Sequence, residues 1–210
     1  MADSFGIPQL VDYLTNMGLC IANVDQEQEI IELAFRGDNG QWRLIVHIQQ
    51  GEETRKLMFI VPHFGMVTTK KRLQCLEALL AVNYRIAMGK FGIDLEDGEV
   101  RLEEAIPLAN SGIAEDQFQL VFSAMLQIAA MYHSLIPRIV YGNLTTQQAL
   151  KACEEDFIQE IENMQEIDGS NEEIKVTQAL SETSTPHELN VQDVLAEVKR
   201  LLGEAGESKE

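Results

Sequence analysis

The sequence predicts an α+β fold in which helices pack on an antiparallel sheet of about five strands. Three observations support this prediction. Apolar residues recur at three- and four-residue spacing in several segments, they alternate with polar residues in others, and Asn-Gly and Asp-Gly pairs separate alternating segments. The predicted order is helix, three strands, helix, two strands and helix, followed by an acidic helical extension.

The first 61 residues predict one helix followed by a three-stranded meander. Pro8 suits the opening turn of the helix, and Gly18 lies near its end. The strands are predicted over residues 29–35, 41–49 and 56–61. Asn39 and Gly40 allow the positive φ of a tight hairpin, so the first two strands should pair antiparallel. Pro62 is expected to end the third strand.

The middle of the domain predicts a second helix over residues 70–86 with an unusually wide apolar surface. Leucine and tyrosine residues share one face of it, and further apolar residues widen that face. The shared face comprises Leu73, Leu76, Leu80 and Tyr84, and the widening residues are Ala78, Leu79 and Val82. So much apolar surface indicates burial on two sides, or a partner protein against one of them.

The rest of the predicted domain is a hairpin and a long helix. Strands at 91–95 and 99–106 flank the turn residues Asp97 and Gly98. The helix over residues 114–135 is the most hydrophobic in the chain.

The chain divides after residue 144. Residues 1–144 form the predicted α+β domain, 145–164 an acidic helix, 165–190 a flexible linker, 191–203 a short amphipathic helix and 204–210 a disordered tail. A helix of about twelve residues is marginal in water unless its apolar face finds a surface. The helix at 191–203 is therefore predicted to bind a partner surface, in cis or in trans, through Val191, Val194, Leu195, Val198, Leu201 and Leu202.

Charge and composition narrow the function classes. The 210 residues carry 34 acids and 16 bases, a formal charge of −18, of which residues 151–210 contribute 5 − 16 = −11. This acidity argues against a nucleic-acid or anionic-membrane partner. Apolar runs stay shorter than the roughly 18–20 residues of a membrane span, the N-terminus does not resemble a signal peptide, and three scattered cysteines do not suggest disulfides. We therefore expect a cytoplasmic protein.

Catalytic and metal-binding motifs are not evident, so no catalytic, cofactor or metal site is predicted. Cys75 follows a basic turn that could lower its pKa, but a small core residue is the favoured interpretation. The segment 94–98 suits a hairpin better than a calcium loop, because its glycine falls one position early. Six acids between 154 and 166 could bind a metal, but they spread around their helix and favour a solvated face. They are Glu154, Glu155, Asp156, Glu160, Glu162 and Glu166.

Three consecutive segments resemble the central signature of YbjN-domain proteins. They are the leucine-rich segment 76–84 ending in Asn83-Tyr84, the G-K-F-G segment 88–94 and the D-G-E hairpin at 97–100. The resemblance covers about residues 5–136. It implies the fold of type III secretion chaperones of the CesT/Tir class, which often form homodimers and bind extended segments of client proteins. YbjN proteins are described as sensory-transduction regulators, and the resemblance carries over no catalytic residue.

The function expected from these observations is non-enzymatic binding of a partner protein segment, as a chaperone-like adaptor or regulator. The resemblance adds the expectation of a homodimer. The alternative is a small-molecule-sensing regulator of signal transduction, with a ligand pocket between sheet and helices.

Overall fold

The computed structural model describes residues 5–37, 40–51, 54–109, 111–168 and 189–190. The helices are α1 (Ile7–Asn16), α2 (Arg72–Arg85), α3 (Glu115–Tyr132), α4 (Leu135–Val140) and α5 (Thr146–Asp168), with a 3₁₀ turn at Thr69–Lys71. The strands are β1 (Asn23–Asp25), β2 (Ile30–Gly37), β3 (Gly40–Gln50), β4 (Arg55–Met66), β5 (Lys90–Ile93), β6 (Glu99–Leu108) and β7 (Leu189–Asn190). The predicted α+β class and the order of its main elements are confirmed.

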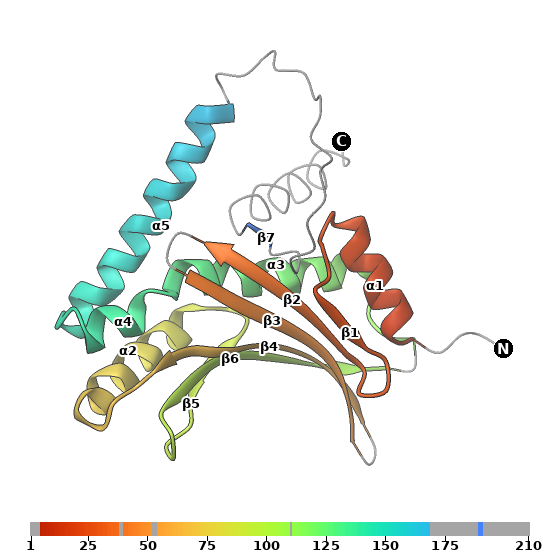
Figure 1. The fold of residues 1–210 in the computed structure, drawn as a ribbon, viewed down its shortest axis with the longest axis horizontal. Coiled ribbons are helices and arrows are strands. Elements are labelled where there is room, and N and C mark those ends of the chain that lie inside the picture. Colours follow the sequence, from red (N-terminus) through yellow and green to blue (C-terminus); the bar gives the residue numbers. More distant parts are fainter. Residues whose placement is uncertain (1–4, 38–39, 52–53, 110, 169–188, 191–210) are drawn as a thin grey trace, which may run out of the picture.

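The strands form one curved sheet in the order β1-β2-β3-β4-β6-β5, with every neighbouring pair antiparallel (Figure 1). Both predicted hairpins are present. Gly37 pairs with Gly40 at the end of the β2–β3 ladder, and Gly98 takes a φ of +84° between β5 and β6. Two short strands were not predicted, β1 and β7, and both pair with β2.

The expectation that Pro62 ends the third strand is wrong. β4 continues through Pro62 to Met66, and its pairing register with β6 shifts between Val61 and Gly65. His63 has a φ of +51° inside this irregular stretch. A bulge interrupts the regular ladder, so the missing N–H of proline removes no regular ladder bond there.

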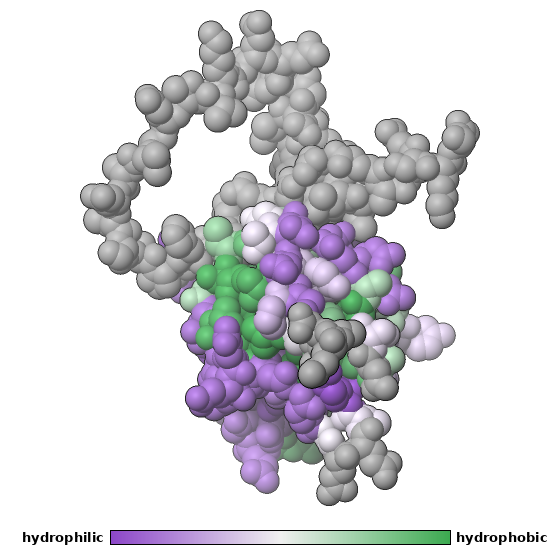
Figure 2. All heavy atoms as spheres, turned by 90° about the vertical axis from the view of Figure 1, so that its right-hand side faces the viewer, coloured by the Kyte–Doolittle hydropathy of each residue, from purple (hydrophilic) through white to green (hydrophobic). Residues whose placement is uncertain are grey.

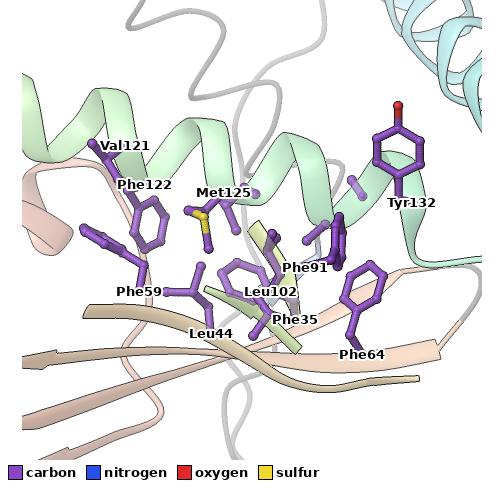
Figure 3. Packing of buried hydrophobic residues seen from close by; sticks show 14 of the residues in the cluster. Phe35, Leu44, Phe59, Phe64, Phe91, Leu102, Val121, Phe122, Met125 and Tyr132 are labelled. Atoms are coloured by element: carbon purple, nitrogen blue, oxygen red, sulfur yellow. The ribbon is translucent and has the colours of Figure 1, made fainter. Parts of the chain in front are cut away.

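The core lies between the sheet and α3. Figure 3 shows Phe122 and Met125 of α3 directed toward Phe59, Leu44 and neighbouring side chains of the sheet. All four of these side chains are fully buried. Figure 1 shows α1 over the same face of the sheet as α3. The predicted apolar helix is therefore a core element.

The stretch Glu115–Val140, which contains α3 and α4, meets the length and composition criteria for a membrane span, with a mean hydropathy of 1.4 over its 18-residue window. The model buries 56% of that window against the rest of the fold. Burial of this kind is the pattern of a core helix, and the same test passes such helices.

The extension beyond the predicted domain packs onto it. Helix α4 was not predicted, whereas α5 was, and α5 contacts α2, α3 and α4. The buried side chains of α5 are Ala149, Leu150, Cys153 and Phe157. α5 extends to Asp168, and β7 lies at 189–190. The other residues of the predicted linker and the predicted helix at 191–203 lie outside the described residues.

Candidate protein-binding surfaces

The first candidate surface is a stripe of exposed apolar side chains on α2, formed by Leu73, Leu76, Leu80 and Tyr84. Leu73, Leu80 and Tyr84 are 82%, 72% and 92% exposed, and Leu76 is half-buried. The spacing of three and four residues places them on one side of the helix. The other side packs inward through Cys75, Ala78, Leu79 and Val82. The widening residues of the sequence analysis are thus the buried face, and the residues expected to share one face are the exposed one. We call Leu73, Leu76, Leu80 and Tyr84 the α2 stripe.

Hydrogen bonds from the neighbouring elements hold α2 in place. Gln74 Nε2 donates to the Leu144 carbonyl at 2.6 Å, and Thr146 Oγ1 donates to the Gln74 carbonyl at 3.3 Å. At the other end of the helix, Arg85 pairs with Glu154 of α5 at 2.6 Å. The α2 stripe is therefore presented on a fixed helix.

Asn83 joins α2 to strand β5. Its Nδ2 donates to the Phe91 carbonyl at 2.9 Å, and the Phe91 amide donates to Asn83 Oδ1 at 2.8 Å. Both hydrogen bonds of the side-chain amide are made to one residue eight positions away. This explains physically why an asparagine at the end of this helix is followed by the G-K-F-G strand in the signature of the sequence analysis.

The second candidate surface is the face of the sheet opposite the core. Registers align Ile45 with Ile60 at the centre of this face, and Glu32 and Glu103 lie beyond them in the same row. Side chains directly opposite each other in neighbouring strands share a face. Ile45 and Ile60 are half-buried, and Arg43 lies 3.9 Å from Glu32. This face therefore has a small apolar centre bordered by charges.

The third candidate surface is the outer edge of β2. β1 pairs with residues 30–32 of this strand only, and β7 pairs in parallel further along, Leu189 with Phe35 and Asn190 with Arg36. Backbone groups at a sheet edge can pair with an added strand. Figure 1 shows β1 and β7 on the outer side of β2.

Apolar surface also occurs away from α2. Seen from the side of α1, the molecule shows hydrophobic atoms gathered in one area next to a large hydrophilic area (Figure 2). Large hydrophobic side chains that are exposed elsewhere include Leu95, Leu120 and Ile158.

The thiols and histidines do not form a reactive cluster in the described part of the chain. Cys75 and Cys153 are buried, and burial raises the pKa of both thiols, although Lys71 acts in the opposite direction on Cys75. The core interpretation of Cys75 is therefore confirmed. Residues that the structure describes contain no group of three His, Cys, Asp or Glu side chains suited to a metal ion.

The acids of α5 are engaged in specific contacts. Glu154 accepts hydrogen bonds from Arg85 and, at 3.2 Å, from the Tyr132 hydroxyl, while Asp156 pairs with Arg138. Lys151 pairs with Glu155 at 3.3 Å. These contacts join the acidic helix to α2, α3 and α4, so its acids do more than solvate a surface.

A small cavity lies between α5 and the turn that joins α3 to α4. Its volume is about 10 Å³, and its lining includes Ser134, Cys153 and His133, whose Nε2 is buried without a hydrogen-bond partner. A space of this size admits about one water molecule. It is too small for a metabolite.

The partner-binding residues predicted from the sequence are not among the surfaces described above. Val191, Val194, Leu195, Val198, Leu201 and Leu202 lie outside the described residues. The α2 stripe was signalled by the width of its apolar surface. The β2 edge gave no signal, because two-residue pairing leaves no period in a sequence.

The described geometry offers apolar surface and a sheet edge on an α+β scaffold, which defines a protein suited to non-covalent binding. Residues 9–136 match the YbjN family, described as "Putative bacterial sensory transduction regulator". The chain belongs to the YbjN family, and the resemblance noted in its sequence is confirmed.

Solved structures show related arrangements. The chain is similar to a chain of the ExsC–ExsE complex, with 19% identity, a TM-score of 0.44, and coverage of 62% of this chain and 92% of that one. It is also similar to YbjN from E. coli, described as "a putative transcription regulator", with 17% identity, a TM-score of 0.37, and coverage of 60% and 86% respectively. No curated protein matches the chain significantly.

Proposed function

We propose that this chain is a non-enzymatic, cytoplasmic regulator that works by binding a segment of a partner protein. Membership of a family described as sensory-transduction regulators supports the regulatory part of this proposal. The binding part rests on one observation, the α2 stripe.

The α2 stripe has the composition of a protein interface. Three large apolar side chains, each more than 70% exposed, lie on one side of a helix that is fixed by its neighbours. Contiguous exposed apolar surface in a protein that is not embedded in lipid marks an interaction site. Its aromatic member, Tyr84, belongs to a residue type enriched in interface hot spots.

The first partner that we assign to the α2 stripe is a second copy of the chain. A two-fold interface uses the same surface patch on both subunits, so one apolar stripe is sufficient to form it. The homodimer expected from the family resemblance agrees with this assignment. Light scattering at micromolar concentration is expected to give twice the chain mass of 23.6 kDa.

Site-specific photo-crosslinking in cells tests the proposed function. A photoreactive phenylalanine analogue at Tyr84 should give crosslinked protein products, identified by mass spectrometry as a second copy or another protein. The same analogue at Ile158, which is 54% exposed on α5, is the matched control. If Tyr84 gave no more crosslinked protein than Ile158, the proposal would be wrong.

Charge reversal on the α2 stripe supplies the complementary measurement. Leu80→Glu with Tyr84→Glu should leave the unfolding transition unchanged, because both side chains are exposed, and should halve the mass in light scattering. Leu120→Glu, at a residue 49% exposed on α3, is expected to change neither quantity. A dimer that survives the double substitution would remove the assignment of the second copy to this stripe.

The alternative of a small-molecule sensor gains no support from the cavity described above. Its volume of about 10 Å³ excludes a metabolite.

A further inference from the structure

The backbone of β2 shows which of its groups face outward. The Ala22 amide donates to the Glu32 carbonyl at 2.9 Å on the outer side, whereas the Ile48 amide of β3 donates to the Glu29 carbonyl at 3.0 Å on the inner side. Because both backbone groups of a residue in an antiparallel strand point the same way and the direction alternates, Ala34 and Arg36 also face outward.

The outer edge of β2 is divided between two short strands of the same chain. β1 covers residues 30–32, and β7 pairs at Phe35 and Arg36. Within the described residues, β7 is the only strand that runs parallel to its neighbour in this sheet. A parallel neighbour requires a long crossover connection, and the segment from α5 to β7 supplies one.

The pairing of β7 is short compared with what this edge can bind. β7 contributes two residues, whereas the edge from Leu33 to Gly37 offers five. A partner strand that paired with all five would make more backbone hydrogen bonds than β7 does. A longer extended segment could therefore displace β7 from the edge.

The side chains of β2 give the edge a fixed shape. Leu33 and Phe35 are fully buried, and the Phe35 ring stacks on Trp42 of β3 with 4.5 Å between ring centroids. Figure 3 shows Phe35 among the core side chains. The edge is thus a rigid template whose backbone can be read without rearrangement of the core.

We propose that residues 33–37 of β2 form a strand-addition site for an extended protein segment, and that this chain's own Leu189–Asn190 occupies the site in cis and competes with the partner. This inference rests on the proposed function, because it names the regulation of partner binding. Displacement of β7 would also release the region that follows it, where the sequence predicts the amphipathic helix 191–203. Partner binding at the edge and exposure of that region are thereby coupled.

Amide hydrogen exchange measured by NMR on the full chain tests the occupancy of the edge. Leu189→Pro with Asn190→Pro removes two backbone donors from β7. The amides of Ala34 and Arg36 should then exchange at least tenfold faster, while those of Leu33 and Phe35, which face β3, keep their rates. The control is Ser181→Pro with Glu182→Pro, which leaves the β7 sequence unchanged.

Binding of a peptide in trans tests the competition. A fluorescein-labelled peptide of residues 184–196 should bind the Leu189→Pro, Asn190→Pro chain, and bind the wild-type chain at least tenfold more weakly. Ala34→Pro added to that chain should abolish binding, because it removes an outward-facing donor while sparing the β2–β3 ladder.

Each result decides for or against the inference. Unchanged exchange of Ala34 and Arg36, a uniform increase across β2, or equal peptide affinity of the two chains would overturn it. These measurements use no foreign partner, so they fail independently of the crosslinking at Tyr84. Selective exchange without crosslinks would leave the edge occupied and remove the proposed function, and the reverse result would remove only the inference.

Discussion

Tyr132 couples the end of α3 to the acidic helix, and its ionisation should make stability depend on alkaline pH. Its side chain is buried, and its hydroxyl points away from the sheet (Figure 3) and donates to Glu154 at 3.2 Å. Burial, with the Glu154 charge second, raises the pKa of Tyr132 from 10.0 to about 12. The folded state thus keeps this proton where the unfolded state has lost it. Stability from this group is fully present below pH 10 and should fall by about 1.4 kcal/mol per pH unit up to pH 12.

Tyr132→Phe isolates that contribution. The variant loses the hydrogen bond, an offset of about 1 kcal/mol at neutral pH, but it lacks the ionisation. Denaturant unfolding at several pH values between 9 and 12 should show the wild-type and variant stabilities converging as pH rises. Parallel curves across this range would show that Tyr132 ionises equally in both states.

The residues of α2 show where periodicity stops being informative. Apolar side chains occupy both sides of this helix, so the period predicted a helix without deciding which side faces the core. The structure buries the side with smaller residues such as Cys75 and Ala78, and exposes Leu80 and Tyr84. The choice depends on contacts with β5, α4 and α5, which are distant in sequence. The sequence therefore indicated a binding surface on this helix but misassigned its residues.

At the scale of elements, α5 is an integral part of the fold rather than an attached arm, and a pair of neighbouring residues tests this. Phe157 is 8% exposed and packs toward the domain, while Ile158 is 54% exposed. Phe157→Ala should lower the free energy of unfolding by about 3 kcal/mol, since it leaves a cavity. Ile158→Ala should change it by less than about 0.5 kcal/mol. Denaturant unfolding with equal m-values measures both, and similar small effects would indicate that α5 is detached.

Elements with strong periods or turn signals were predictable, and elements defined by long-range contacts were not. β2, β3 and the β5–β6 hairpin followed from alternation and from Asn-Gly and Asp-Gly turns. Strand β1 is three residues long, and the six-residue α4 is too short for a period to emerge. Pro62 misled because a bulge, which depends on pairing with β6, accommodates it.

On the scale of the whole molecule, the acidity is distributed differently from what the sequence suggested. Residues 151–168 carry seven acids and one base, −6, and residues 169–210 carry nine acids and four bases, −5. More than half of the charge assigned to an extension therefore lies on α5, where Arg85 and Arg138 pair with part of it. The argument against a nucleic-acid partner is unchanged, because the net charge remains −18.

Deletion of residues 169–210 tests whether the described fold is complete at the end of α5. The buried residues of α5 end at Phe157, so the shortened chain keeps every side chain identified as buried in the core. It should unfold in one cooperative transition, with a stability within about 1 kcal/mol of the full chain, because only the two-residue pairing of β7 is lost. Its net charge becomes −18 + 5 = −13. Loss of the cooperative transition in thermal or denaturant unfolding would show that residues beyond α5 belong to the core, and β7 would then be a structural strand instead of a displaceable one.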